Sequence, residues 1–330
     1  MRLYRRIIKV YKKDQVTVLY PQKLVNRIMR KTLNQKLISR GGRNMGWTDW
    51  EPVEGNNFKD IIYENKYHQE LEGGVARITI NRPQKLNALT ADTMDELFHA
   101  FYEANHDPTI GVIVLAGSGD KAFCTGGDVV WEEKELRTQV YWRYPPPQIL
   151  RMSRKPVIAA VKGYCMGMGN CLAYFSDFTI AAENAVFAQG GPRVANPVDG
   201  YVVAYLVSVV GAKKAREIYM LCRRYTAQEA LEMKLVNTVV PVEKIESEVD
   251  KWCEEILALS PGCIEVLKAT FDMEIDYMAG SYGQLARLMF PDWFTSLEAK
   301  EGPRAFLEKR KPNFWKIRKD ELKSRRKSDS

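Results

Sequence analysis

Histidine is scarce in this sequence, and its cysteines are not spaced as metal ligands or redox pairs. The three histidines, His68, His99 and His106, lie away from the glycine-rich segments described below. The six cysteines include no CxxC pair, a pattern that favours buried thiols in a reducing compartment over disulfides or zinc ligation. We therefore predict a cytoplasmic protein with no metal site and no His-based catalytic triad.

Long apolar runs are also missing. No stretch of 18 apolar residues occurs, so no segment is expected to span a membrane. The chain has 330 residues, of which 45% are apolar and 27% charged. That composition is typical of a globular protein, and the length allows one large domain or two ordinary ones.

The net charge of +8 is unevenly distributed. Residues 1–44 hold thirteen of the 49 Lys and Arg and one of the 41 Asp and Glu, so the other residues carry 36 basic and 40 acidic side chains. Three interpretations of this basic leader remain open: an organellar transit peptide, a nucleic-acid-binding arm, or translated sequence upstream of a start at Met45. Residues 316–330 form a second basic segment, a C-terminal tail.

Strands and helices alternate from about residue 60, which predicts an α/β fold. A hairpin is expected with Gly73 and Gly74 in its turn and 75–80 as its second strand, followed by a helix capped near Thr90. Helices dominate after Val202, and one of them presents an apolar face at helical spacing. The residues of that face are Ile245, Val249, Trp252, Ile256 and Leu259.

Two glycine-rich turns each follow a predicted buried strand: "FCTGGD" at 123–128 and "GYCMGMGNC" at 163–171. Neither has the spacing of a P-loop or of a dinucleotide-binding fingerprint, which argues against a phosphate cradle. Glycine allows close approach to the backbone, and the second turn leads into a helix N-terminus with free N–H groups. Each turn alone is explained by ordinary turn chemistry. The two together indicate N–H donors that converge on one oxyanion.

Four ordered motifs make the chain resemble the crotonase, or enoyl-CoA hydratase/isomerase, superfamily from about residue 60 to 315. They are "ITINRPQKLNAL", "KAFCTGGD", "KPVIAAVKGYCMGMGN" and "AQEALEMKLVNTVVP". The resemblance implies a spiral of ββα units at 45–241, a C-terminal helical trimerisation region at 242–315, and trimers or dimers of trimers. It also implies an acyl-CoA substrate, no further cofactor, and an enolate held by the N–H groups of Gly127 and Met168.

The resemblance also implies where the rest of the acyl-CoA binds. Met168 stands where relatives usually have glycine, so we expect a reshaped acyl pocket. Lys85, Asn87 and Ala88 fall where relatives bind the nucleotide and pantetheine. The remaining implied contacts are Thr125, Gly126, Asp128, Val129, Tyr164, Gly167, Asn196, Phe294 and Lys309.

Within this superfamily, "GAKKAREIYMLCRRYTAQEALEMKLVNTVVP" and "EGPRAFLEKRKPNF" are similar to dihydroxynaphthoyl-CoA synthase and 2-ketocyclohexanecarboxyl-CoA hydrolase. This similarity implies a cyclic or aromatic-derived acyl-CoA and hydration, isomerisation or ring opening as the reaction. The catalytic positions differ, however. Cys171 and Gly191 replace the two hydratase glutamates, and Asn196, Val198, Phe294 and Leu86 replace the synthase's serine, aspartate, tyrosine and arginine.

Asp199 is the leading candidate for proton transfer, since a partly buried carboxylate in this loop could act as an acid or base. The alternative is that Asp199 only caps a helix beginning at Tyr201. Further candidates are Tyr144, Tyr164, Glu132 and Glu133, the two glutamates having surface charge as their alternative. Cys124, Cys165 and Cys171 are interpreted as small residues that tight packing accepts.

Two other functions stay open at this point. One branch of the superfamily binds AU-rich RNA through basic surface helices, but the basic excess here lies in the leader, so nucleic acid is an improbable partner. An inactive homologue that binds acyl-CoA is the second alternative, because both hydratase glutamates are replaced.

Overall fold

The computed structural model describes residues 46–135, 146–198, 200–276 and 284–328. The basic leader at 1–44, Tyr144 and Asp199 therefore lie outside the described residues. Within the described part of the chain, no helix is both long and apolar enough to cross a membrane.

The larger sheet has seven strands in the order β1-β2-β3-β4-β6-β8-β11. The first three strands pair antiparallel, and from β3 to β11 every pair is parallel. The predicted hairpin is formed by β2 and β3, although Gly74 belongs to β3 and pairs with Tyr67 rather than lying in the turn. The strands are β1 (Glu51–Pro52), β2 (Ile61–Tyr67), β3 (Gly74–Ile80), β4 (Ile110–Gly117), β6 (Val157–Val161), β8 (Phe178–Ala182) and β11 (Thr238–Val240).

A smaller sheet of four strands, in the order β10-β9-β7-β5, carries the two glycine-rich turns. Its strands are β5 (Ala122–Cys124), β7 (Tyr164–Met166), β9 (Val186–Ala188) and β10 (Arg224–Thr226). β5, β7 and β9 are parallel, and β10 pairs antiparallel with β9. Parallel strands joined through helices confirm the predicted α/β class.

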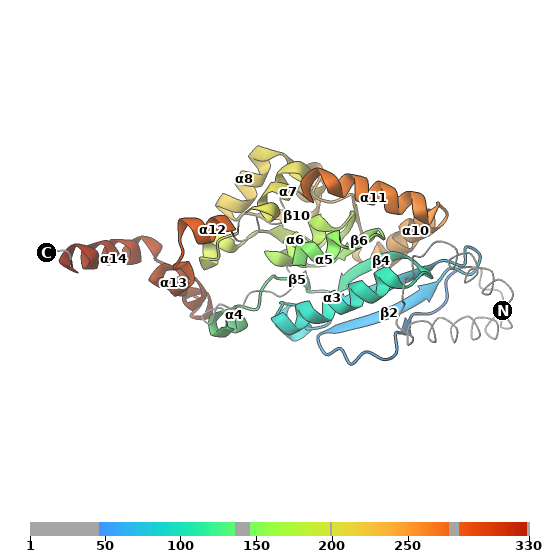
Figure 1. The fold of residues 1–330 in the computed structure, drawn as a ribbon, viewed down its shortest axis with the longest axis horizontal. Helices are drawn as coiled ribbons and strands as arrows, with labels where there is room; N and C mark the ends of the chain where they lie inside the picture. The colour runs from blue at the N-terminus through green and yellow to red at the C-terminus, as the bar shows by residue number, and fades with distance from the viewer. Residues whose placement is uncertain (1–45, 136–145, 199, 277–283, 329–330) are drawn as a thin grey trace, which may run out of the picture. The chain divides into compact units, whose positions relative to one another are not determined.

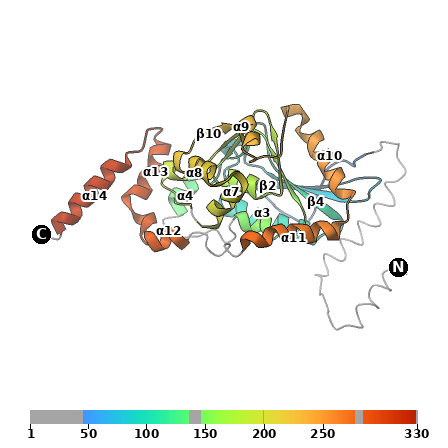
Figure 2. The same cartoon turned by 90° about the horizontal axis from the view of Figure 1, so that it is seen from above.

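Helices cover both faces of the larger sheet (Figures 1 and 2). α3 (Ala91–His106) packs on one face, and it begins where predicted because Thr90 and Thr93 form a capping box. α10 (Ile245–Leu257) packs on the other face through Ile245, Val249 and Cys253. The prediction of an apolar face on this helix holds except at Leu259, which lies beyond the helix end and is exposed.

Two helices follow the glycine-rich turns directly: α4 (Val129–Glu135) and α6 (Met168–Phe175). The remaining α-helices are α5 (Pro146–Arg151), α7 (Tyr201–Val210), α8 (Ala212–Leu221), α9 (Ala227–Glu232), α11 (Pro261–Asp276), α12 (Gln284–Met289), α13 (Leu297–Leu307) and α14 (Phe314–Ser328). Short 3₁₀ helices are η1 (Pro83–Lys85), η3 (Gly191–Val194), η4 (Val242–Lys244) and η6 (Trp293–Thr295).

The C-terminal helix α13 packs against two segments that are distant in sequence, α4 and η3 (Figure 1). A side chain at Gly302 would come within 2.3 Å of the Val194 carbonyl oxygen, so glycine is needed where α13 crosses η3. The Trp293 indole donates a hydrogen bond to the Ala195 carbonyl at 3.0 Å. The C-terminal region therefore covers the side of the molecule where α4 and η3 lie.

Candidate active site

The two glycine-rich turns lie side by side because they leave adjacent parallel strands, β5 and β7. A Cβ built on Gly126 would be 3.1 Å from the Met168 nitrogen, and one built on Gly169 would be 2.1 Å from the Cys124 carbonyl oxygen. Any side chain at either position would separate the turns. Glycine is required here by close backbone approach, as the sequence pattern predicts.

The N–H groups of Gly127 and Met168, at this junction, have no acceptor among the described residues, and the same holds for Gly169 and Asn170 in the first turn of α6. The residues on either side of Gly127 are hydrogen-bonded to Leu89. The Leu89 N–H donates to the Gly126 carbonyl and the Asp128 N–H donates to the Leu89 carbonyl, both at 2.8 Å. This bridge leaves the Gly127 amide pointing away from Leu89. Met168 is the first residue of α6, so its N–H has no partner within the helix.

A buried ion pair fixes the first turn. The Arg82 guanidinium lies 3.1 Å from an Asp128 carboxylate oxygen and also donates to the Ala88 carbonyl. The other Asp128 oxygen accepts from the amides of Val130 at 3.2 Å and Trp131 at 3.3 Å, which caps α4. Asp128, predicted as a substrate contact, is therefore a structural anchor of the turn and of α4.

The segment 85–88 connects to the same turn. Asn87 has a positive φ and is fully buried. Its side-chain amide is saturated by three backbone partners, the Arg82 nitrogen and the Ser118 and Ala122 carbonyl oxygens, at 2.7–3.0 Å. The Thr125 hydroxyl donates to the Leu86 carbonyl at 3.1 Å. Asn87 thus holds the loop in shape through its side chain, and Lys85 remains exposed beside it.

One carboxylate lies directly against Gly127. A Cβ built on Gly127 would come 1.9 Å from Oε1 and 2.6 Å from Cδ of Glu132. Glu132 is partly buried and makes no hydrogen bond or ion pair with any described residue. Burial, reinforced by the nearby Asp128 carboxylate, raises the pKa of Glu132 to about 7. The side chain of Glu133, the next residue, lies outside the described residues.

The positions that correspond to the two hydratase glutamates carry no carboxylate. Cys171 lies in a buried cluster where the Tyr174 hydroxyl is 3.1 Å and the Gln189 amide nitrogen 3.6 Å from its sulfur. Burial raises the pKa of Cys171 and raises that of Cys124 to about 12, so both are uncharged thiols at neutral pH. At Gly191, a Cβ would lie 2.6 Å from the Asn196 carbonyl oxygen.

The structure describes the loop residues on both sides of Asp199, up to 198 and from 200 onward. Asn196 is partly buried, and α7 begins at Tyr201 as predicted. The N-cap of α7 is Gly200, and Asp199 before it lies outside the described residues, so its two interpretations stay predictions. Phe294 belongs to η6, but its side chain lies outside the described residues.

Arg310 and Lys309 differ although they are adjacent. Arg310 forms a two-pronged pair with the buried Glu301 at 2.5 and 2.8 Å. This pairing lowers the pKa of Glu301 to about 2. Lys309 is exposed and has no ion pair with any described residue.

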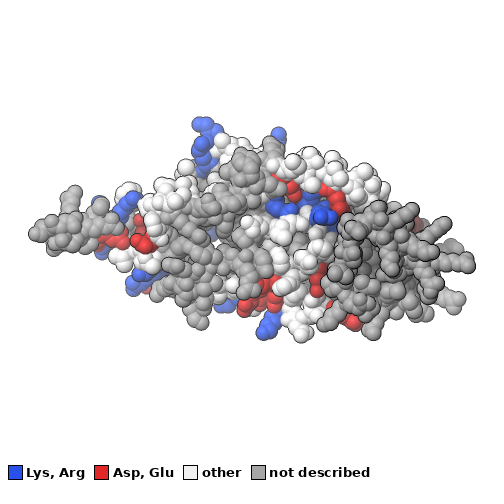
Figure 3. All heavy atoms as spheres, in the orientation of Figure 1, with Lys and Arg blue, Asp and Glu red and all other residues white. Residues whose placement is uncertain are grey.

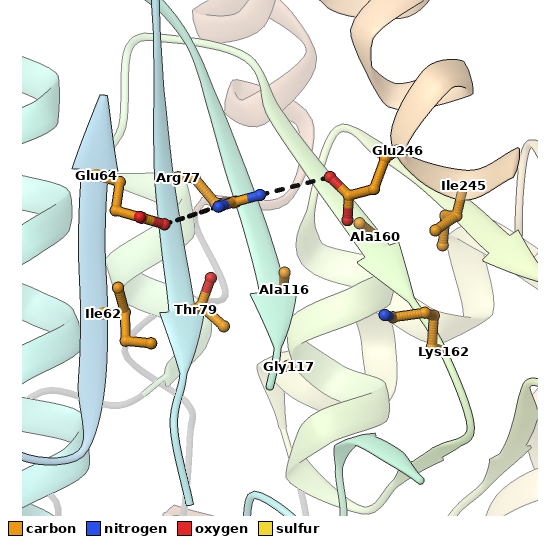
Figure 4. Close-up of a pocket in the computed structure, with 10 residues that line it drawn as sticks. All are labelled: Ile62, Glu64, Arg77, Thr79, Ala116, Gly117, Ala160, Lys162, Ile245 and Glu246. Atoms are coloured by element: carbon orange, nitrogen blue, oxygen red, sulfur yellow. Dashed lines mark hydrogen bonds and ion pairs between the residues drawn. The ribbon is translucent and has the colours of Figure 1, made fainter. Parts of the chain in front are cut away.

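Tyr164 is exposed on β7, and Val129 is partly buried at the start of α4. A pocket of about 200 Å³ lies elsewhere, on the α10 face of the larger sheet, where Arg77 sits between Glu64 and Glu246 (Figure 4). The described residues contain no group of three His, Cys, Asp or Glu side chains placed to hold a metal ion. In the described part of the face in Figure 3, basic and acidic groups are small and interspersed.

Sequence reasoning missed two features. The first is Arg82, which pairs with Asp128 of the glycine turn. The available signal was its place just before Pro83 in the motif "ITINRPQKLNAL". The position of Glu132 against Gly127 depends on how α4 turns back over the strand end, and no local pattern encodes that.

Comparison with known proteins gives a consistent result. Residues 70–317 match the family described as enoyl-CoA hydratase/isomerase. An enoyl-CoA hydratase from Mycobacterium avium subsp. paratuberculosis K-10 has 29% identity and a TM-score of 0.61, covering 73% of this chain and 95% of its own. An enoyl-CoA hydratase/carnithine racemase from Magnetospirillum magneticum has 28% identity and a TM-score of 0.62, and the match covers 80% of this chain and 98% of the other. A monofunctional enoyl CoA isomerase from M. smegmatis has 30% identity and a TM-score of 0.52, covering 61% and 89%.

Proposed function

Because the chain belongs to the enoyl-CoA hydratase/isomerase family, we propose that it stabilises the enolate of a cyclic or aromatic-derived acyl-CoA thioester. The observation that carries this proposal is the pair of unbonded amides, Gly127 and Met168, at the junction of the two turns. Two N–H donors that converge on one point would favour an oxygen that becomes anionic. Each such donor is worth about 3 kcal/mol in comparable acyl-transfer sites.

Isomerisation or ring opening suits this site better than hydration by two glutamates. The glutamate positions hold Cys171, whose thiol is uncharged, and Gly191, which has no room for a side chain. Asp199 remains the loop residue proposed to deliver a proton or activate water. The bulk of Met168 beside the second amide would select the shape of the acyl group.

The CoA portion is proposed to lie along the exposed edge near residues 85–88 and to reach Lys309. Lys309, which has no ion pair within the described part of the chain, is suited to a phosphate, whereas Arg310 is paired with Glu301. The Asn87 carbonyl is the backbone group proposed for pantetheine, because the amides of Asn87 and Ala88 donate to Arg82 and Lys85 and the Ala88 carbonyl accepts from Arg82. This chemistry needs no cofactor other than the CoA of the substrate.

Self-association as a trimer or dimer of trimers forms part of the proposal. α11 and α12 expose many large apolar side chains, more than a solvent-facing helix pair usually carries. They are Val266, Leu267, Phe271, Met273, Leu285, Leu288 and Met289. Light scattering during gel filtration should give a mass near three or six chains, and a single-chain mass would contradict this part.

The decisive experiment is incubation of the protein with cyclic and linear enoyl- and ketoacyl-CoAs, followed by mass spectrometry. Addition of one water, with fragmentation that distinguishes an opened ring from a hydrated double bond, identifies the reaction. Isomerisation leaves the mass unchanged and shifts the chromatographic retention. Binding of these thioesters without turnover of any would show an inactive homologue and contradict the proposal.

A further inference from the structure

Glu132 lies at the candidate site but has no role in the proposed function. Its carboxylate contacts Gly127, whose amide is one of the two proposed oxyanion donors. Only such a small residue leaves room for it, because a Cβ at Gly127 would overlap Oε1. The carboxylate is therefore held beside the point where a thioester oxygen would be bound.

The other described carboxylate at this turn is not available. Asp128 is paired with Arg82 and accepts from the amides of Val130 and Trp131. Glu132, by contrast, has no hydrogen bond to any residue that the structure describes, and α13 packs over the helix that carries it. One of the two acids is a structural anchor, and the other is a partly buried group with no hydrogen-bond or ion-pair partner among the described residues.

We propose that Glu132 transfers the proton at the carbon next to the thioester carbonyl. This inference rests on the proposed function, because it takes the thioester oxygen to be held by Gly127 and Met168. The carbon in question is two bonds from that oxygen, within the region that the Glu132 carboxylate borders. Asp199 is left for a second proton or for water.

The step balances without any further reactant. The Glu132 carboxylate takes the proton from this carbon, and the C–H electron pair forms the carbon–carbon double bond of the enolate. The carbonyl π pair moves onto oxygen, where the two amides stabilise the charge. The protonated Glu132 then returns its proton to the same carbon or to the γ carbon of an enoyl chain, which completes exchange or isomerisation.

The protonation behaviour of Glu132 fits this role. Its pKa of about 7 leaves both forms populated near neutral pH, as a proton-transfer group requires. The charged group that acts on Glu132 is the Asp128 carboxylate, which is itself paired with Arg82. The helix packed against α4, α13, carries Glu298, Arg304 and Glu301, the last of which is paired with Arg310.

The test uses cyclohexanecarbonyl-CoA and butanoyl-CoA, whose α-hydrogens exchange with D₂O whenever an enolate forms. The wild-type chain, Glu132→Gln, Glu132→Asp and Asp199→Asn are compared by mass spectrometry for deuterium uptake and by calorimetry for thioester binding. Glu255→Gln is the matched control, because Glu255 is exposed on α10, outside the candidate site.

We expect Glu132→Gln to bind thioester within about 3-fold of wild type and to lose exchange by about 100-fold or more. Glu132→Asp should exchange at an intermediate rate. Wild-type exchange should rise with pH through about 7 as the base form appears, and Glu132→Gln should lack that rise. A merely structural glutamate would not alter this pH profile.

Exchange by Glu132→Gln at the wild-type rate would overturn the assignment, and loss of exchange in Asp199→Asn alone would transfer it to Asp199. In both cases α-hydrogen exchange by the wild-type chain leaves the proposed function standing. If the wild-type chain binds no thioester at all, the proposed function itself fails.

Discussion

The two sides of the candidate site are built in different ways. The turn side, residues 124–128 and 166–170, is made of backbone held by strand pairing and glycine contacts. The acid side, formed by α4, η3 and α13, is made of side chains and helix packing between segments far apart in sequence. The comparison teaches that the proposed oxyanion donors are fixed by the fold itself, whereas the acids depend on tertiary contacts that can be changed singly.

The largest effect is expected from Gly169→Ala on the turn side. Its Cβ would meet the Cys124 carbonyl oxygen at 2.1 Å, and neither backbone can yield without separating β5 from β7. We expect a loss of more than about 4 kcal/mol in the free energy of unfolding, measured with urea. Gly262→Ala is the control, since nothing lies within 4 Å of its Cβ. Equal stability of the two variants would contradict the close contact.

Removing the ion pair between Arg82 and Asp128 should have the next largest effect. Arg82→Met leaves Asp128 charged and largely buried, and the unpaired carboxylate destabilises both the turn and α4. We expect a loss of about 3 kcal/mol in the free energy of unfolding. Arg154→Met, at an exposed arginine, should change it by less than about 0.5 kcal/mol. A similar small change for Arg82→Met would show that the pair is not an anchor.

A smaller effect is expected on the acid side from Glu301→Gln. Glu301 is held by Arg310 and the Asn313 amide at the end of α13, so the neutral side chain should cost about 2 kcal/mol at pH 7. Because the pKa of Glu301 is lowered to about 2, its contribution is present above about pH 4.5 and is lost as the pH falls toward 2. The melting temperatures of the wild type and Glu301→Gln should approach each other as the pH is lowered from 7 to 3. A constant difference between them over this range would contradict the prediction.

The smallest change in stability, but a large one in activity, is expected for Gly127→Ala. The new Cβ meets only the flexible end of Glu132, so the carboxylate moves and the unfolding free energy falls by about 1 kcal/mol or less. Displacing the proposed proton-transfer group should slow α-hydrogen exchange by about 10-fold to 100-fold. If Gly127→Ala unfolds as easily as Gly169→Ala, the difference drawn between the two sides is wrong.

The sequence predicts the turn side well and the acid side poorly, for a physical reason. Glycine at 126 and 169 and the strands before each turn are local signals, and strand pairing then brings the turns together without further information. The capping box at Thr90 and the start of α7 at Tyr201 are local in the same sense. By contrast, the contact of Glu132 with Gly127 and the crossing of α13 over η3 at Gly302 depend on the packing of distant segments.

A side chain's role was harder to predict than its place. Asn87 and Asp128 lie beside the turns as the motifs imply, but their polar atoms are used to hold the loop and α4. Lys309 and Arg310 are indistinguishable in a basic run, and only the pairing of Arg310 with Glu301 separates them.

A crystal structure with a bound acyl-CoA thioester tests the central claim most directly. The account predicts the thioester oxygen at about 2.7–3.1 Å from the backbone nitrogens of both Gly127 and Met168. It also predicts a Glu132 carboxylate oxygen facing the adjacent carbon. A thioester oxygen bound to other groups, with both amides facing solvent, would contradict it.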